Sequence, residues 1–167
     1  MASVAVGGDA TAELLKTLDL GDTLAIAAVN APAQSVVSGD AAAVQVLLEH
    51  LKESDTKVKA LTVSHAFHSH RMDPMLEEFR AVAESLTWDP ARMAIISNVS
   101  GERAGPEIAT AAYWVDHVRK PVLYCEGVRA ALKEGVAVFV ELGPDPVLSG
   151  MGAQCVEEGS PRWLPSL

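Results

Sequence analysis

The chain has 167 residues, of which 49% are hydrophobic and 21% charged, and its formal net charge is −9. This composition is that of a globular protein with a buried core, and the excess of acidic residues disfavours nucleic acid as a partner. No apolar run approaches the roughly 20 residues that cross a bilayer, and no cationic segment precedes a hydrophobic stretch at the N-terminus, so we expect no membrane partner and a cytoplasmic location.

The first 64 residues predict a small unit of strands and helices. Its apolar patterns give, in order, strand 2–6, helix 9–18, strand 23–30, strand 35–39, a helix after Asp40 and strand 58–64. Asp40 is expected to cap the second helix, whose apolar residues recur at helical spacing at Val44, Leu47, Leu48 and Leu51. The order β-α-β-β-α-β is that of a ferredoxin-like unit, in which both helices cover one face of a four-stranded antiparallel sheet. We therefore place a ferredoxin-like subdomain at residues 1–64.

The remainder, residues 65–167, has a different pattern. It predicts a helix that starts near Pro74, strand 93–98, helix 107–118, helix 122–134 and strand 136–142. The apolar stripe of the first helix is expected to pack on a neighbour and consists of Met75, Phe79, Val82, Ala83 and Leu86. Apolar strands that alternate with helices indicate a parallel sheet covered on both faces, and two strands are too few to form one. We interpret this segment as the C-terminal part of a larger α/β subdomain whose other strands lie outside the chain.

Three of the five histidines, His65, His68 and His70, lie within six positions, directly after the strand predicted to end at Ser64. Because ligands bind at the carboxyl ends of strands in α/β sheets, we expect this loop to share a site with those at Asn98 and Gly143. Three interpretations stay open: a metal site with Asp73 as fourth ligand, a general base, or surface histidines. The spacing HxxHxH differs from the helical spacing of zinc proteases, and His70 beside Arg71 fits a surface position.

A histidine base requires a nucleophile. The chain contains no G-x-S-x-G sequence, the strand-to-helix turn that exposes a catalytic serine, and neither Ser38 nor Ser149 has a similar context. Cys125 and Cys155 are far apart in sequence and form no CxxC, so we expect reduced thiols. From the residues alone, the histidine loop is at best half of an active site.

A family resemblance narrows these interpretations. The segment VSHAFHSHRMDPML resembles the HAFH region of the acyltransferase domains of modular type I polyketide synthases, which are relatives of malonyl-CoA:acyl carrier protein transacylases. Other segments similar to the family follow its order and spacing, namely LAIAAVNAPAQSVVSGD, IISNVSGE, YWVDHVRKPVLY and VFVELGPDPVLSGM. The resemblance covers nearly the whole chain. It implies an α/β-hydrolase-like subdomain with an inserted ferredoxin-like subdomain, of which this chain is the C-terminal portion.

The resemblance also implies a reaction. His68 matches the family's general base, which deprotonates a GHSxG serine for attack on malonyl-CoA and then the phosphopantetheine thiol of an acyl carrier protein. The family's serine, oxyanion-hole glutamine and carboxylate-binding arginine precede this region and are absent from the chain. No bound cofactor is implied. The implied partners are the acyl carrier protein, the missing N-terminal half of the domain and neighbouring synthase domains.

Further roles follow from the same resemblance. His65, Ala66 and Phe67 belong to the specificity motif, which reads HAFH in malonyl and YASH in methylmalonyl enzymes, and His65 matches a position that differs between them. The Phe67 ring would fill the space of a C2 methyl group, although ordinary core packing also explains it. Asn30 is a candidate substrate contact or a turn residue, and His117 matches a position whose backbone carbonyl orients the base. The ending PRWLPSL resembles the exit toward the next linker, and Trp163 would pack on that linker or on the domain surface. The alternative function is a non-catalytic ferredoxin-like module that binds an acyl carrier protein.

Overall fold

The structure is a computed structural model that describes residues 1–156 and 161–166. Its first part contains β1 (Ala2–Val4), α1 (Gly8–Thr17), β2 (Leu24–Ala31), β3 (Gln34–Gly39), α2 (Ala41–Glu53) and β4 (Val58–Ala60). Its second part contains a 3-10 turn (His70–Met72), α3 (Asp73–Glu84), a 3-10 turn (Pro106–Ala109), α4 (Ala111–Arg119), α5 (Tyr124–Lys133), β5 (Val138–Glu141), α6 (Val147–Gly152), a 3-10 turn (Ala153–Cys155) and β6 (Arg162–Pro165). Throughout the described ranges, every helix is too short or too polar to span a lipid bilayer.

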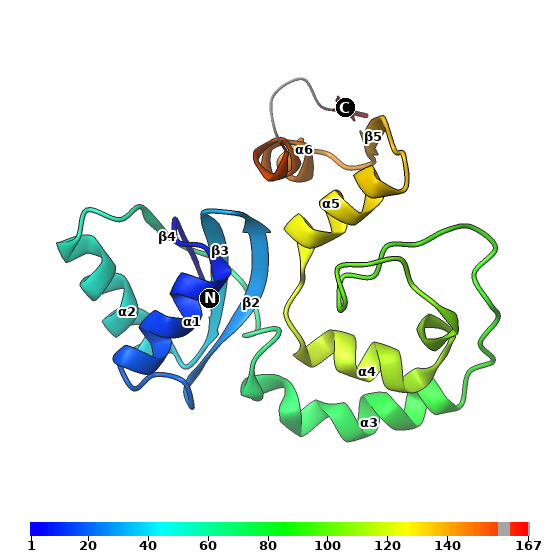
Figure 1. Ribbon diagram of the computed structural model, residues 1–167. Coiled ribbons are helices and arrows are strands. Elements are labelled where there is room, and N and C mark those ends of the chain that lie inside the picture. The colour runs from blue at the N-terminus through cyan, green and yellow to red at the C-terminus, as the bar shows by residue number, and fades with distance from the viewer. Residues whose placement is uncertain (157–160, 167) are drawn as a thin grey trace.

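The first part forms an antiparallel sheet in the order β2-β3-β1-β4, and α1 and α2 cover one of its faces (Figure 1). The predicted order of elements is therefore present. The last strand, however, ends at Ala60 rather than at residue 64. Among the strands that the structure describes, β4 pairs with the three-residue β1, and this pairing ends where Ala2 faces Ala60. The chain beyond Leu61 therefore has no described strand to pair with.

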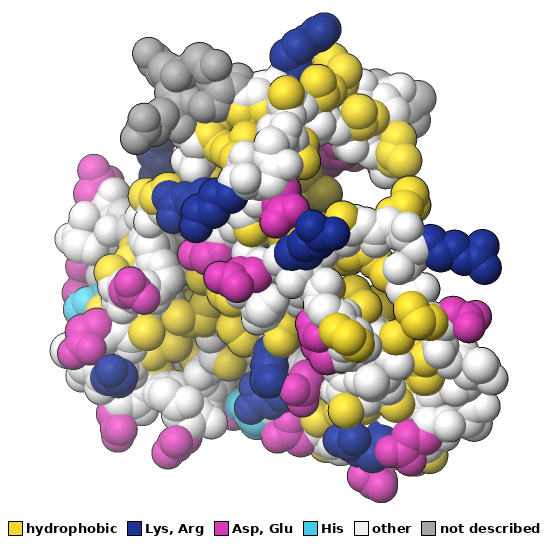
Figure 2. Space-filling view, turned by 45° about the vertical axis from the view of Figure 1, so that its right-hand side comes forward, with side chains coloured by type: hydrophobic (Ala, Val, Ile, Leu, Met, Phe, Trp, Pro, Cys, Tyr) yellow, Lys and Arg dark blue, Asp and Glu magenta, His cyan; other side chains and the backbone are white. Residues whose placement is uncertain are grey.

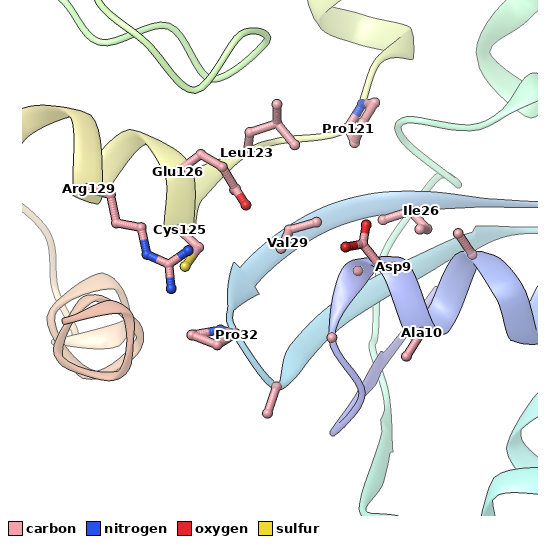
Figure 3. Close-up of a pocket in the computed structure, with 14 residues that line it drawn as sticks. Asp9, Ala10, Ile26, Val29, Pro32, Pro121, Leu123, Cys125, Glu126 and Arg129 are labelled. Carbon is pink, nitrogen blue, oxygen red and sulfur yellow. The ribbon is translucent and has the colours of Figure 1, made fainter. Parts of the chain in front are cut away.

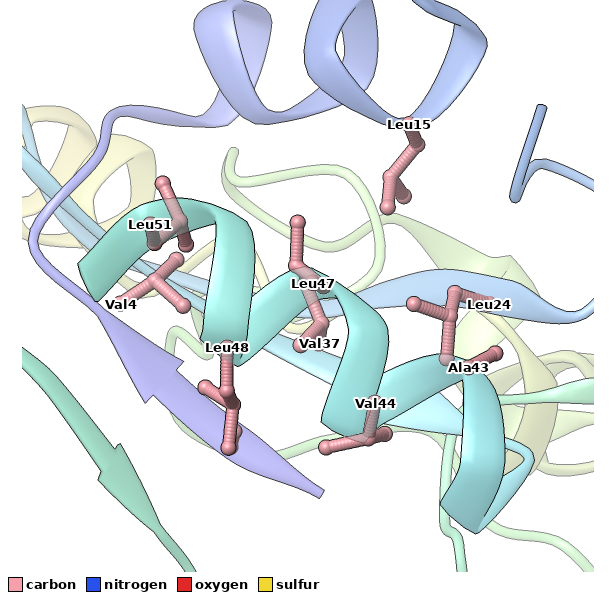
Figure 4. Packing of buried hydrophobic residues seen from close by; sticks show 10 residues of the cluster. Val4, Leu15, Leu24, Val37, Ala43, Val44, Leu47, Leu48 and Leu51 are labelled. Atoms are coloured by element: carbon pink, nitrogen blue, oxygen red, sulfur yellow. The ribbon is translucent and has the colours of Figure 1, made fainter. Parts of the chain in front are cut away.

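The core of this part lies between the sheet and α2. The predicted apolar face of the helix is buried in full, and in Figure 4 its leucines lie over Val4 and Val37 of the sheet while Leu15 approaches from α1. Asp40 precedes α2 as predicted, but its carboxylate makes no hydrogen bond to the helix N-terminus. The predicted side-chain cap is thus wrong. The carboxylate instead reaches two side chains of the histidine loop.

In the second part, α3 packs against α4. The rings of Trp88 and Trp114 stack with centroids 6.0 Å apart, and each indole N–H donates to a backbone carbonyl. Of the predicted stripe on α3, only Ala83 is buried, whereas Met75, Val82 and Leu86 are exposed. Within the described chain, the helix therefore finds a neighbour for only part of its apolar face.

The predicted strand 93–98 is wrong. Its backbone pairs with the adjacent segment, where Ile96 bridges to Arg103, and the Asn98 carbonyl accepts one hydrogen bond from the N–H of Leu123. Met93 is 82% exposed. A buried strand requires neighbouring strands on its edges and layers on its faces. Because no described strand lies beside residues 93–98, their apolar side chains cannot stabilise an extended ladder.

The strand predicted at 136–142 is present as β5, over Val138–Glu141. It pairs in parallel with β6, which lies in the segment expected to lead into a linker; Leu167 lies outside the described residues. Trp163 of β6 stacks on Phe139 with ring centroids 4.4 Å apart and lies against Gly152. Of its two expected places, on a linker or on the domain, the contacts fit the domain, where Trp163 belongs to this small second core. Val138 and Val140 of β5 remain exposed.

The two parts meet along β2. The N–H of Val29 donates to the Val122 carbonyl, and the N–H of Val122 donates to the Ala27 carbonyl, each at 2.9 Å. The edge strand β2 of the small sheet thereby forms a parallel bridge, between Ala28 and Val122, with the segment that joins α4 to α5 (Figure 1). This junction brings α1 and β2 beside the histidine loop.

The Glu141 carboxylate closes the turn after β5. Its two oxygens accept hydrogen bonds from the N–H groups of Leu148 and Ser149, at 2.8 and 2.7 Å. Partial desolvation raises the pKa of Glu141, but these backbone hydrogen bonds outweigh it and leave the pKa below its ordinary value. A lowered folded-state pKa means that the carboxylate stabilises the fold above its unfolded-state pKa and that this stabilisation is lost as the pH falls through the folded-state pKa.

We therefore expect Glu141→Gln to lower the urea midpoint at about pH 7 and to have a smaller effect at about pH 3, because the wild-type carboxylate loses its stabilising contribution as the pH falls toward and through its lowered folded-state pKa. Urea unfolding of both proteins at the two pH values measures this difference. Glu134→Gln, which removes a carboxylate from an exposed ion pair with Arg103, is the control. An equal loss from Glu141→Gln at both pH values would contradict the prediction.

Candidate functional site

His68 occupies the centre of the histidine loop in a strained conformation. Its φ of 59° lies in the left-handed region, which costs a non-glycine residue free energy and requires the surroundings to hold it. Its N–H donates to the Val118 carbonyl at 3.2 Å, and its Nδ1 lies 2.7 Å from the Lys120 carbonyl oxygen. A carbonyl can only accept, so Nδ1 carries the proton and Nε2 has the free lone pair. The His68 imidazole is therefore oriented with Nε2 free to accept a hydrogen bond or a proton.

The structure corrects the predicted role of His117. The carbonyl that orients His68 belongs to Lys120 instead, because Lys120 follows the end of α4 in an extended conformation before Pro121. The His117 ring packs beside Tyr113 and Trp114, with its centroid 6.4 Å from that of His68. Burial, and then the nearby charge of His68, lower the pKa of His117. The lowered pKa disfavours the charged form of the His117 imidazole.

The residues before His68 form the exposed side of the loop. Nδ1 of His65 lies 3.0 Å from the Ser64 hydroxyl, and its ring meets the edge of the Phe67 ring at 5.9 Å. Phe67 is 43% exposed, so within the described chain it is not a core residue. The Ala66 carbonyl accepts a 2.6 Å hydrogen bond from the hydroxyl of Ser69, which is fully buried. Ser69 was not singled out in the sequence, although a serine ahead of a short helical turn is a typical capping signal.

The remaining members of the cluster are paired elsewhere. Nε2 of His70 lies 2.9 Å from the Asp40 carboxylate, and Asp73 pairs with Arg119 at 2.8 Å. Among residues 1–156 and 161–166, no three His, Cys, Asp or Glu side chains gather closely enough to hold a metal ion. The four candidate ligands of the metal hypothesis do not converge.

Asn30 and Asn98 lie apart from His68. The Asn30 carbonyl accepts a hydrogen bond from the Cys155 thiol at 3.2 Å, and Asn98 borders a separate small hollow with Tyr124 and Phe139. The expected convergence of the loops at Asn98 and Gly143 with the histidine loop is not observed. That expectation assumed neighbouring strands in one sheet, and residues 93–98 form no such strand.

Two neighbouring hollows lie at the junction of the two parts, and one of them borders His68. One, of about 380 Å³, is bordered by His68 and Arg119 together with Leu24 and Lys16. The other, of about 640 Å³, extends to Arg129. Both are lined by Ala12, Ile26 and Pro121, so they are adjacent, and together they are here called the junction groove. Figure 3 shows the larger end, bordered by Asp9 and Ala10 of α1, Ile26 and Val29 of β2, and Cys125, Glu126 and Arg129 of α5.

The junction groove has an apolar middle and charged ends. Such a groove suits an elongated ligand with an apolar stem and polar termini, and His68 lies at one of its ends. Ser38, Ser149, Cys125 and Cys155 do not border the hollow at His68. Both cysteines are buried and unpaired, and burial, with Cys125 beside it, raises the pKa of Cys155 to about 12. A thiol with that pKa is a poor nucleophile at neutral pH.

Comparisons with known proteins agree on one kind of domain. A family model described as "Acyl transferase domain" matches residues 1–163. The chain is 50% identical over 131 residues to polyketide synthase GfsA of Streptomyces halstedii, which covers 78% of the chain and 2% of that protein. It is 41% identical over 170 residues to the PKS-NRPS hybrid synthetase acdB of Aspergillus candidus, which covers 100% of the chain and 7% of that protein. The chain thus spans less than a tenth of either relative.

Solved structures show the same fold. The acyltransferase domain from the second module of the salinomycin polyketide synthase superposes with a TM-score of 0.92 at 40% identity. The match covers 99% of this chain and 38% of that one. The mixed α/β fold described above is therefore also present in that acyltransferase domain.

Proposed function

The chain belongs to the acyltransferase domain family, and we propose that it supplies the general base and specificity loop of a site that transfers malonyl groups in a modular polyketide synthase. Its relatives are parts of multidomain synthases. The observation that carries the proposal is the orientation of His68, whose Nδ1–H is held by the Lys120 carbonyl while its side chain borders the junction groove.

In the proposed reaction, Nε2 of His68 removes the hydroxyl proton of a GHSxG serine as the serine oxygen bonds to the carbonyl carbon of malonyl-CoA. The carbon–sulfur bond then breaks, and the imidazolium returns its proton to the departing thiolate of coenzyme A. In the second half, His68 deprotonates the phosphopantetheine thiol of an acyl carrier protein, and the thiolate sulfur bonds to the carbonyl carbon of the acyl-serine. The carbon–oxygen bond to serine then breaks, and the imidazolium returns its proton to the serine oxygen. This ping-pong scheme places the nucleophile outside these 167 residues.

The junction groove is the proposed path of the substrate. The pantetheine arm of either thioester is a long chain with an apolar stem, and the middle of the groove is apolar. With the thioester at His68, the arm would extend past Ile26. Asn30 remains a proposed substrate contact, although the structure places it at the far end of β2.

We further propose two subdomains: a ferredoxin-like unit at residues 1–64 and the C-terminal part of a large α/β subdomain at residues 65–167, a range that includes the undescribed residues 157–160 and 167. Exposed apolar side chains of the subdomain at residues 65–167 favour a partner that covers them. In Figure 2 these apolar side chains reach the surface at the top, where β5 and α6 lie, and in the lower part over α3. The edge of a parallel strand such as β5 is rarely left open in folded proteins. The proposed covering partner is the preceding segment of an acyltransferase domain.

Complementation tests the function. The chain is combined with the preceding segment of a polyketide synthase acyltransferase domain that carries the GHSxG serine, and the product is called the complemented domain below. We expect the chain alone to transfer no malonyl from malonyl-CoA to an acyl carrier protein and the complemented domain to transfer it. Transfer by the chain alone, or a stable complex without transfer, would overturn the proposal.

A specificity prediction concerns Phe67. Its exposed ring next to His65 would occupy the space of a C2 methyl group, and one methyl in a pocket changes selectivity by about 10-fold or more. We expect Phe67→Ala in the complemented domain to raise kcat/KM for methylmalonyl-CoA relative to malonyl-CoA by about 10-fold. Competition between the two substrates measures the ratio, and Val63→Ala is the control from the same loop. An unchanged ratio would contradict a role for Phe67 in selecting between the two substrates.

A further inference from the structure

We propose that Asp40 is a positioning residue for the acyl transfer proposed above: it fastens the loop that carries His68 to the small sheet through His70 and Arg71. This inference rests on the proposed function. It gives roles to His70, which the sequence alone presents as a surface residue, and to a carboxylate that leaves its expected capping position unused.

One carboxylate oxygen of Asp40 contacts both His70 and Arg71. Oδ1 of Asp40 lies 2.6 Å from Nε of Arg71 and 2.9 Å from Nε2 of His70. An aspartate that directly precedes a helix normally accepts hydrogen bonds from the first helical N–H groups. At α2 the Asp40 side chain accepts none of them, and its carboxylate contacts a segment 31 positions away instead.

The backbone that carries this carboxylate is fixed. The N–H of Asp40 donates to the Thr23 carbonyl at 3.0 Å, and its own carbonyl accepts from the N–H of Val44 at 2.9 Å. The preceding Gly39 has φ 150°, and a Cβ there would collide with the Thr23 carbonyl, so the approach is tight. Asp40 is therefore a rigid point at the junction of β3 and α2.

A short hydrogen-bonded turn connects this point to His68. The buried Ser69 hydroxyl donates to the Ala66 carbonyl at 2.6 Å and accepts from the N–H of Arg71 at 3.3 Å. Met72, at the end of the turn, is also buried. A displacement of His70 or Arg71 would thus be passed to His68 through a turn that has little room to absorb it.

His68 is also held from the side of α4. The Lys120 carbonyl accepts from its imidazole, and Arg119 pairs with Asp73 just beyond the turn. The base lies between two anchors, Asp40 on the small sheet and the end of α4. Two anchors explain how the left-handed conformation of His68 persists, since strain of that kind requires surroundings that over-determine it.

Positioning is the expected effect, rather than large stabilisation. The ion pair is partly exposed, with Arg71 at 58% of its side chain, and such pairs contribute little to folding. In contrast, a catalytic group misplaced by about 1 Å can lower a rate by about 100-fold. The Arg71 hydrogen bond holds the pKa of Asp40 below its usual range, which keeps the carboxylate charged at neutral pH.

The kinetic test uses Asp40→Asn in the complemented domain. We expect kcat for malonyl transfer to fall at least about 10-fold while KM for malonyl-CoA stays within about 2-fold, and Asp40→Glu to restore part of the rate. Glu134→Gln removes an exposed ion pair of similar length, with Arg103, and is expected to leave both constants unchanged. An unchanged kcat, or an equal loss in Glu134→Gln, would overturn the proposal.

A spectroscopic test uses the chain itself. In Asp40→Asn, the imidazole NMR signals of His68 should shift and its N–H, bonded to Val118, should exchange faster, while the N–H of Leu47 in the core keeps its protection. Unchanged His68 signals in Asp40→Asn would contradict the proposed positioning role of Asp40. If the wild-type complemented domain transfers no malonyl, the proposed function fails, whereas this comparison still decides whether Asp40 holds His68.

Discussion

Replacing His68 with asparagine in the complemented domain is expected to reduce malonyl transfer by about 10²- to 10⁴-fold, the usual contribution of a positioned acid–base group. Asparagine tolerates the left-handed backbone found at φ 59°, so the loop keeps its course. Its amide cannot take and return a proton near neutral pH. The loss then reports the missing imidazole rather than a distorted turn. Alanine at the same position should lose at least as much.

Both half-reactions should be affected. Single-turnover measurement of serine acylation by malonyl-CoA and of transfer from the acyl-serine to the carrier protein separates them, because His68 is the proposed base in each. His50→Asn is the control, since His50 is an exposed histidine of α2 that takes no part in the histidine loop. Transfer that survives His68→Asn at near wild-type rates would refute the base assignment.

The sequence predicts the fold well where burial follows from local spacing. In α2, the apolar residues recur on one helical face, and Val44, Leu47, Leu48 and Leu51 are all buried as expected. The same kind of inference gives a wrong strand at residues 93–98. An apolar run forms a buried strand only if neighbouring strands and layers exist, and the spacing of apolar residues does not reveal whether such neighbours are present. β6 shows the converse, because its pairing depends on β5 and its own residues have no clear alternation.

For the candidate site, the sequence identifies His68 but not what holds it. The Lys120 carbonyl lies 52 positions away, and any residue type could supply it, so no side-chain signal marks it. His117 was predicted for this role by resemblance, and the end of α4 brings a different carbonyl to His68. Asp40 carries a capping signal that α2 does not use. The supporting contacts of a base are long-range and partly backbone, which explains why a motif locates the base alone.

The small unit should depend strongly on Leu47. This side chain is fully buried at the centre of α2 and packs in the core that contains Val4 and Val37 (Figure 4). Leu47→Ala removes three carbon atoms from a filled interior, and such changes cost about 2 to 5 kcal/mol, through lost apolar burial and the cavity that remains. Domains have a total stability of only about 5 to 15 kcal/mol, so this one change removes a large share.

Urea unfolding of the chain, followed by circular dichroism, measures the loss, and hydrogen exchange in α2 locates it. The matched control is Val46→Ala on the same helix, because Val46 is 50% exposed and its truncation is expected to cost no more than about 0.5 kcal/mol. Alanine has a helix propensity at least as high as that of leucine or valine, so neither variant loses stability through propensity and a loss in Leu47→Ala reports burial. If Leu47→Ala cost as little as Val46→Ala, the α2 face would not be the core of the small sheet, and Asp40 would lose the rigid base from which it reaches His70 and Arg71.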